Sequence, residues 1–308
     1  MLNTTRLRIL REVAARGTII AASEALYLTP PAVSHQLKVL EQEMGIPLLE
    51  RTARSIRLTD AGRRLVEHAE TILAECEEAY ADVVSFSIEI SGHIRLSTFQ
   101  TAAQSFALPA VADILKKYPQ LDVVVSELEP LRAIPALKAG QIDIALSHEW
   151  DFVPLPKDRG VDRYDLLFEP IVVVLPVGHP LASGPVRLKD LSEERWCVAH
   201  ESAASRLAVD RVAQSAGFEP RIILESNYFR AIGSAVEARL GVGIAPLMTD
   251  LRGLDIVIQP LIEPTMERRI FAAVRRGSGR SPAMRAVLDA LETVAGTLGP
   301  ESLPEFRP

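Results

Sequence analysis

The chain has 308 residues, of which 48% are hydrophobic and 24% are charged, values typical of a soluble globular protein. No apolar stretch approaches the roughly 20 residues that a membrane-spanning helix needs, and the charged first segment lacks the apolar core of a signal peptide. Two cysteines are too few for a disulfide framework. We therefore expect a cytoplasmic protein of two or three domains that makes no membrane contact.

Charge is distributed unevenly along the chain. The net charge is −6, yet residues 1–65 hold ten Lys and Arg against six Asp and Glu, so this segment carries +4 and the rest carries −10. A basic segment attached to an acidic body indicates a domain that binds a polyanion. Many solvent-exposed surfaces also carry a small excess of basic residues, so the charge alone does not identify the binding partner.

Three helices are predicted in the basic segment. Residues 5–15 place apolar side chains at helical spacing, and Gly17 ends this helix. A short second helix at 20–26 is rich in small residues, which let two helices approach closely. Thr29 is a good N-cap, and Pro30 suits the first position of a third helix.

The third helix has the pattern of a recognition helix for double-stranded DNA. Its apolar stripe leaves Ser34, His35 and Lys38 on the opposite face, and short polar groups followed by a lysine suit a helix in the major groove. Two short strands at 47–49 and 56–58 then flank an arginine-rich turn, the pattern of a wing. A helical bundle with solvated arginines is the alternative. The expected DNA-binding residues are Thr29, Pro30, Pro31, Ser34, His35, Lys38, Arg51, Arg54 and Arg57.

A long helix is expected from residue 60, because no helix breaker follows Gly62 until Gly92. Its apolar residues alternate steps of four and three, which is the seam of a coiled coil. We therefore expect a homodimer or homotetramer in which this helix pairs with a second copy. Packing against the body of the same chain is the alternative. The seam residues are Leu65, Ala69, Ile72, Cys76, Ala79, Val83 and Phe86.

These motifs resemble, in order and spacing, the amino-terminal part of LysR-type transcriptional regulators. The matching segments are TIIAASEAL (18–26), PAVS (31–34) and LTDAG (58–62). Pro30 stands where the family usually has glutamine, which removes one polar DNA contact, and Leu49 replaces the usual phenylalanine. The resemblance implies a winged helix-turn-helix DNA-binding domain at 1–59 and a linker helix at 60–90 that pairs two heads. Further matching positions are Leu40, Glu41, Gly45, Leu48 and Arg51.

From residue 94 the pattern changes to alternating strands and helices, which predicts an α/β fold with a mainly parallel sheet. The expected strands are 94–97, 122–126, 142–147, 166–176, 196–200, 222–225, 243–246 and 269–274. The expected helices are 107–118, 131–139, 204–216, 229–240 and 282–298.

This body resembles the effector-binding part of the same family, which is similar to a periplasmic binding protein with two subdomains. The matching motifs are LKAGQIDIA (137–145), HPLA (179–182) and ARLGVGIA (238–245), in which Arg239 stands where the family often has glycine. The resemblance implies an effector domain at 91–300 and a C-terminal tail at 301–308. Subdomain I would comprise 91–163 and 267–300, and subdomain II would comprise 164–266.

Ligands of open α/β folds bind beyond the carboxyl ends of strands, where helix N-termini offer amides to an anion. We therefore expect a small polar or anionic metabolite as effector. For any single Ser or Thr, a helix cap without a ligand is an equally good interpretation. The expected effector-binding residues, taken from these strand ends and from the cleft of relatives, are Thr98, Phe99, Gln100, Thr101, His148, Ser202, Ala203 and Asn227.

The sequence contains none of four common catalytic or nucleotide-binding motifs: HExxH, the phosphate-binding GxxxxGK loop, GxSxG and a complete GxGxxG. The six histidines show no metal-ligand spacing. We therefore expect no enzyme, cofactor or metal, but a regulator whose grip on DNA changes with effector occupancy. A solute-binding module and an α/β enzyme with an accessory DNA-binding domain are the alternatives.

Overall fold

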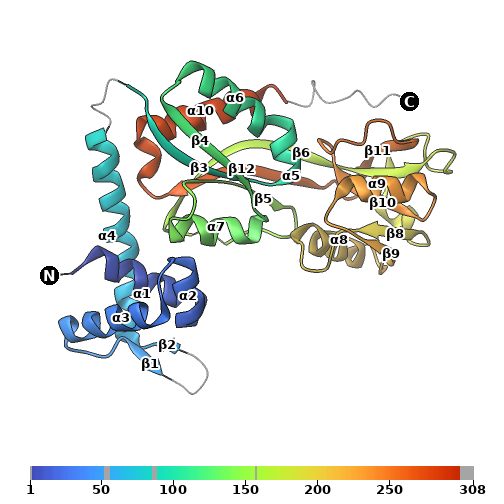
Figure 1. Ribbon diagram of the computed structural model, residues 1–308. Coiled ribbons are helices and arrows are strands. Elements are labelled where there is room, and N and C mark those ends of the chain that lie inside the picture. The colour runs from blue at the N-terminus through green and yellow to red at the C-terminus, as the bar shows by residue number, and fades with distance from the viewer. Residues whose placement is uncertain (1, 52–55, 85–88, 157, 299–308) are drawn as a thin grey trace.

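The computed structural model describes residues 2–51, 56–84, 89–156 and 158–298. They form a small helical head, a long helix and an α/β body with two lobes (Figure 1). Within these ranges, no helix combines the length and apolarity that a membrane crossing requires.

The head is a three-helix bundle with a two-stranded wing. Asn3, Thr18 and Thr29 each accept amide hydrogen bonds as N-caps, so local sequence begins all three helices. Gly17 and Gly45 end the first and third helices in the left-handed conformation. The elements are α1 (Thr4–Arg16), α2 (Ile19–Ala25), α3 (Pro30–Met44), β1 (Leu49–Arg51) and β2 (Ile56–Leu58).

The linker helix α4 (Asp60–Val84) begins inside the head. A Cβ at Gly62 would overlap the carbonyl of Leu48, so only glycine lets the helix approach the chain just before the wing this closely. Leu65 and Ala69 are buried in the head's own core. The expected seam is therefore wrong at these two residues, because their own chain already covers them.

The second half of α4 differs, because one of its faces packs on lobe I, where Glu77 pairs with Arg275, while another face points outward. Ile72 packs at the edge of the head core, whereas Cys76, Ala79 and Val83 are exposed. Val83 is 72% exposed. Phe86, the last expected seam residue, lies outside the described residues. An apolar surface therefore continues along the distal half of the helix.

One continuous sheet of ten strands, counted among the described residues, runs through both lobes. Its long strand β6 (Val161–Pro176) pairs with β12 (Glu267–Arg275) in its first part and with strands of the second lobe in its last part. The α/β expectation is therefore confirmed. The two lobes are joined by long strands rather than by a separate linker.

Lobe I contains β3, β4 and β5, and its apolar core lies between this sheet and helices α6 and α10 (Figure 1). β3 pairs in parallel with both β4 and β5, as predicted for alternating strands and helices. The elements are β3 (Gly92–Thr98), β4 (Leu121–Glu127), β5 (Ile144–Trp150), α5 (Gln100–Ala102), α6 (Leu108–Lys117), α7 (Pro130–Ala139) and α10 (Pro282–Gly296). A π-helical turn at Ala103–Ala107 joins α5 to α6.

Lobe II has its own apolar core. Two of its strands, β7 and β11, are not predicted from the sequence, since short half-buried segments lack a clear alternation. The elements are β7 (Val186–Arg187), β8 (Arg195–Val198), β9 (Arg221–Glu225), β10 (Val242–Pro246), β11 (Ile256–Ile262), α8 (Ala204–Ser215) and α9 (Phe229–Glu237).

The departure from the family pattern at Arg239 lies in the turn that ends α9. Arg239 has φ of 58°, the left-handed region that favours glycine. The amide of Arg239 donates to the carbonyl of Val236, and the amide of Leu240 donates to the carbonyl of Ala235. These two hydrogen bonds form a Schellman motif. The arginine also donates to the carbonyl of Val177 at 3.1 Å. The position therefore requires a glycine-like backbone, and arginine adopts it.

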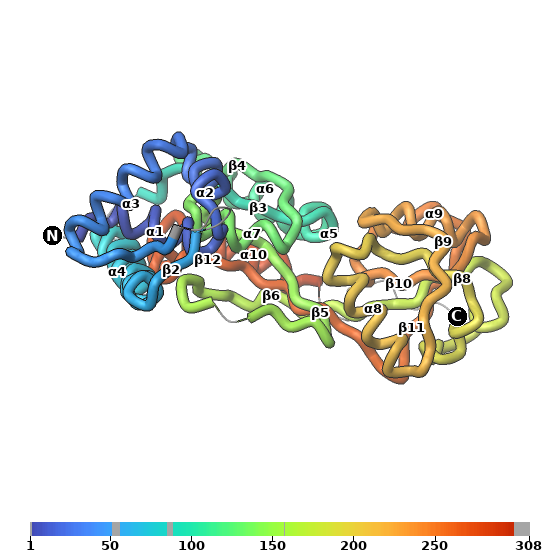
Figure 2. The backbone as a smooth tube through the Cα atoms, turned by 90° about the horizontal axis from the view of Figure 1, so that it is seen from below, coloured from blue at the N-terminus to red at the C-terminus, as the bar shows by residue number. Residues whose placement is uncertain are grey.

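The head lies beside lobe I and away from lobe II (Figure 2). Gln141 Nε2 donates to the carbonyl of Ala25 at 2.7 Å, and Lys138 Nζ lies 3.2 Å from Oε1 of Glu70 on α4. Arg11 of α1 donates to the carbonyl of Lys138. Polar contacts therefore tie the head and its linker helix to the body of the same chain.

Candidate functional site

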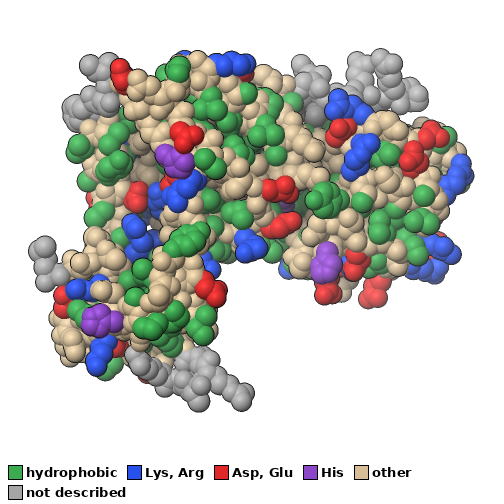
Figure 3. Space-filling model, viewed as in Figure 1, with side chains coloured by type: hydrophobic (Ala, Val, Ile, Leu, Met, Phe, Trp, Pro, Cys, Tyr) green, Lys and Arg blue, Asp and Glu red, His purple; other side chains and the backbone are tan. Residues whose placement is uncertain are grey.

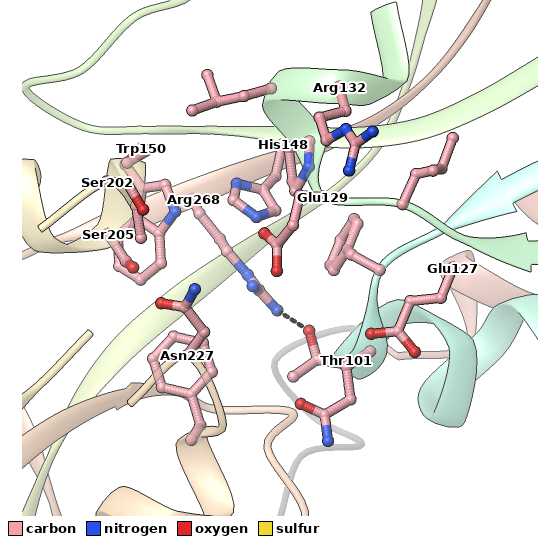
Figure 4. A pocket seen from close by; sticks show the side chains of 18 of the residues that line it. Thr101, Glu127, Glu129, Arg132, His148, Trp150, Ser202, Ser205, Asn227 and Arg268 are labelled. Carbon is pink, nitrogen blue, oxygen red and sulfur yellow. Dashed lines mark hydrogen bonds between the residues drawn. The ribbon is translucent and has the colours of Figure 1, made fainter. Parts of the chain in front are cut away.

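A cavity of about 370 Å³ lies between the two lobes (Figure 4). Lobe I contributes the chain after β3, the loop before α7, and the end of β5. Lobe II contributes the segment that leads into α8 and the segment that leads into α9. The cavity therefore lies beyond the carboxyl ends of several strands, where open α/β folds bind ligands.

Strand register places a buried arginine in the wall of this cavity. Arg268 on β12 is paired with Trp150 on β5 and with Glu169 on β6. Because side chains alternate along a strand, Arg268 faces the same side as Ile270, which is fully buried. Ile270 is in turn paired with His148. The crossing strands thus bring these side chains together from three distant parts of the sequence.

Arg268 is held by two hydrogen bonds. Its Nε donates to Oε2 of Glu169 at 2.5 Å, and its Nη2 donates to the hydroxyl of Thr101 at 2.6 Å. Burial lowers the pKa of Arg268, and the carboxylate of Glu169 opposes this shift. Glu169 also accepts from the amide of Met248 at 2.6 Å. This network connects the crossing strands with the first turn of α5.

Aromatic rings line the cavity beside Arg268. Phe99 and His148 meet edge to face at 4.7 Å between centroids, and Trp150 lies 6.1 Å from His148 and 6.5 Å from Phe229. Burial and the charge of Arg268 hold the pKa of His148 well below its ordinary value, so its ring is neutral at pH 7. Nδ1 of His148 and Nε1 of Trp150 are buried and have no hydrogen-bond partner among the described residues.

Lobe II presents hydroxyl and amide groups on the opposite wall. Nδ1 of His200 lies 3.0 Å from the hydroxyl of Ser202, and the amide of His200 donates to Oδ1 of Asn227 at 3.1 Å. These bonds fix the two segments that face the cavity, while Ser202 and Asn227 themselves remain exposed to solvent. Polar groups from this lobe are therefore available to a bound molecule.

The structure brings most of the expected effector residues together. Thr98 is the exception, because it is buried and its hydroxyl donates to the carbonyl of Phe99 instead of facing the cavity. Arg268 and Trp150 also line the cavity and are not among the residues expected from the sequence. The sequence does contain a signal for Arg268. In the alternating pattern of its strand, this charged residue falls on the same inward face as the apolar Ile270. The expected residues that line the cavity are Phe99, Gln100, Thr101, His148, Ser202, Ala203 and Asn227.

The expected DNA-binding residues lie on α3 and the wing. Pro30 and Pro31 occupy the first helical positions after the N-cap Thr29, and Thr29 accepts from the amide of Ala32 at 3.4 Å. Ser34 is half-buried. The exposed members are Thr29, Pro30, Pro31, His35, Lys38 and Arg57. The backbone of Arg51 belongs to β1, and Arg54 lies outside the described residues.

Two family descriptions match the chain. Residues 4–63 match the bacterial regulatory helix-turn-helix protein of the lysR family, and residues 88–296 match the LysR substrate binding domain. A probable HTH-type transcriptional regulator, LrrA of Synechococcus elongatus, is 29% identical over 96% of this chain and 98% of its own length. A probable RuBisCO transcriptional regulator of Synechocystis sp. is 26% identical over 97% of this chain and 89% of its own length.

Solved structures share the fold. A full-length variant of OxyR from Pseudomonas aeruginosa has a TM-score of 0.65 with 20% identity and covers 100% of this chain and 99% of its own. Full-length CbnR in complex with its target DNA has a TM-score of 0.54 with 22% identity, and the match covers 96% of this chain and 100% of the CbnR chain. The relatives are regulators rather than enzymes. The chain belongs to the LysR family of transcriptional regulators, with a DNA-binding helix-turn-helix domain and an effector-binding domain.

Proposed function

We propose that the interlobe cavity binds a small metabolite and that its occupancy changes how a dimer or tetramer of this chain grips double-stranded DNA. The observation that carries the proposal is the convergence of seven expected residues, from both lobes, on one cavity. A molecule that bonds to both walls would favour one angle between the lobes, which is the two-state element that regulation needs.

The cavity suits an effector that has a flat apolar part and one polar or anionic group. Phe99, Trp150 and Phe229 supply apolar faces. Because Glu169 neutralises the charge of Arg268, an anion would be held by hydroxyl and amide donors such as Thr101 and Ser202, together with the guanidinium of Arg132, which also lines the cavity. Trp150 also offers an indole N–H that no described residue accepts.

The DNA interface that we propose comprises the first turns of α3 and the wing. His35 and Lys38 are exposed on the same helix, as base or phosphate contacts require. We further propose that the distal half of α4, with Cys76, Ala79 and Val83, pairs with a second copy, since this apolar surface is exposed. We also propose the domain limits: the DNA-binding domain at 1–59, the linker helix at 60–90 and the effector domain at 91–300. The two subdomains of the effector domain would meet at 163/164 and 266/267.

The experiment uses a panel of small aromatic and aliphatic carboxylates with their neutral amides. Binding is followed by thermal shift of the full chain, and DNA binding by fluorescence anisotropy with fragments identified by genome-wide mapping of bound DNA. Ser202→Trp fills the cavity and should abolish the response to the compound that binds, while DNA binding persists. Thr293→Trp places the same ring at an exposed position of α10, far along the chain from the cavity residues, and is the matched control. A normal response of the Ser202 variant would contradict the cavity assignment.

A further inference from the structure

A second cavity, of about 170 Å³, lies at the junction of the head, the linker helix and lobe I. Figure 3 shows basic side chains gathered where the head meets the body. Two acidic side chains of α4, Glu70 and Glu77, also face the cavity. Its cationic lining residues are Arg8 and Arg11 of α1, Arg95 of β3, Lys138 of α7, and Arg275 and Arg276 at the end of β12.

Some of these cations are already paired. Arg95 and Arg275 both contact Oδ1 of Asp143, at 2.9 and 3.2 Å, and Arg275 also lies 3.3 Å from Glu77. Lys138 lies 3.1 Å from Asp158 in addition to its contact with Glu70. These carboxylates therefore offset the positive charge of Arg95, Lys138 and Arg275.

Two other cations have no counter-ion within the described ranges of the chain. The side chains of Arg8 and Arg276 are exposed and form no ion pair with any described residue. They come from opposite sides of the junction, since Arg8 belongs to the head and Arg276 to the body. The cavity thus has unpaired guanidinium groups on two walls, each of which presents a fork of N–H donors.

Arg11 gives an independent indication of a missing partner. Its side chain is buried, with 7% exposure, and its Nε has no hydrogen-bond partner in the part of the chain that the structure describes. Its Nη2 reaches the carbonyl of Lys138 and lies 3.4 Å from Glu12. Burial and the nearby charge of Arg8 lower the pKa of Arg11, while Glu12 opposes the shift. An unsatisfied buried donor on a charged group is costly, so this site favours an additional acceptor.

We propose that this cavity binds a phosphate group, either inorganic phosphate or the phosphate of a small ester. Arginine forks match the oxygens of a tetrahedral oxyanion, and several such donors at fixed positions are a typical phosphate site. A phosphate there would accept from Arg8 and Arg11 of the head and from Arg276 of the body. It would therefore hold the head against lobe I, separately from the effector cavity between the lobes.

The test measures phosphate binding to the full chain by isothermal titration calorimetry, against chloride at matched ionic strength. Arg8→Gln and Arg276→Gln should each weaken binding at least about tenfold. Neither side chain is buried or paired, so both variants should fold, which circular dichroism verifies. Arg221→Gln is the matched control, because Arg221 is an exposed arginine of β9 in lobe II. It should leave phosphate binding unchanged.

Glycerol phosphate is titrated in parallel. Tighter binding of inorganic phosphate would identify the free ion as the ligand, and tighter binding of glycerol phosphate would identify a phosphate ester. Slower hydrogen exchange of α7 in the presence of phosphate would support bridging of the head and body. Equal affinity in the wild type and in the Arg8 and Arg276 variants would overturn the proposal. The proposal would also be overturned if titration with chloride gave the same binding heats as titration with phosphate. If phosphate does not bind and both variants weaken binding to nonspecific DNA, the arginines serve DNA instead and the proposal fails.

Discussion

Arg268 on β12 and Glu169 on β6 form a charged pair in which Nε and Oε2 lie 2.5 Å apart and the two side chains are 1% and 0% exposed. The pair lies on the strands that connect the lobes, and the amide of Met248 and the hydroxyl of Thr101 complete its hydrogen bonds. It therefore has a structural role in the crossing region and a place in the wall of the effector cavity.

Removing one partner of this pair should destabilise the protein strongly. Glu169→Ala leaves the buried guanidinium of Arg268 unpaired, so we expect a loss of about 3–5 kcal/mol in the free energy of unfolding, measured by urea denaturation. Glu193→Ala is the control, since its pair with Arg221 is exposed and contributes at most about 1 kcal/mol. Similar losses in the two variants would show that burial does not determine the strength of the Arg268 pair.

Stability should depend on pH through His148. The folded chain keeps this ring neutral because its pKa is lowered, whereas the unfolded chain binds a proton below about pH 6.5. The unfolded state then binds more protons, so stability falls as the pH falls through 6.5, with a slope of up to about 1.4 kcal/mol per unit. His148→Phe should remove this slope in urea titrations between pH 5 and 7.5. His68→Phe, at an exposed site on α4, should retain it.

Lys38 should contact a DNA phosphate. Lys38→Ala should weaken binding to all sequences alike and reduce the slope of log affinity against log salt by about one. Fluorescence anisotropy at several salt concentrations measures this slope. Lys116→Ala removes an exposed lysine of the body and should leave the slope unchanged. A wild-type slope in the Lys38 variant would remove this residue from the interface.

A charge on the distal half of α4 should dissociate the oligomer. Val83→Asp would bury an unpaired carboxylate if the two copies of α4 pair there, so sedimentation velocity should show monomers. Val177→Asp, at a 40% exposed site in lobe II, is the control. Ala69→Asp should instead unfold the head, because Ala69 belongs to its core. An intact oligomer in the Val83 variant would place the contact elsewhere.

Local signals explain why the head could be predicted from the sequence. Thr18 and Thr29 cap helices through hydrogen bonds within three residues, and Gly17 ends α1 through its own backbone conformation. None of these requires knowledge of distant contacts. Arg239 was not interpreted from the sequence: its left-handed conformation after α9 and its contact with the carbonyl of Val177 are visible only in the structure.

Long-range contacts explain the failures. A step of four and three residues describes both a coiled-coil seam and a stripe that packs on a head, so periodicity alone assigned Leu65 and Ala69 to the wrong partner. Likewise, Arg268 acquires its role only when β12 pairs with β5 and β6, which are separated from it by about a hundred residues or more. Thr98 was placed at the right strand end, but its side chain faces inward.

The burial of Leu65 in the head core makes the head and α4 a single rigid lever. With 25 residues, α4 is roughly 37 Å long, so each degree of tilt at one end displaces the other by roughly 0.6 Å. A tilt of about five degrees therefore displaces the head by about the 3.4 Å rise of one base pair. A rotation of lobe I that breaks its contacts with Ala25 and Glu70 and tilts α4 by this amount would shift a recognition helix out of register with its half-site.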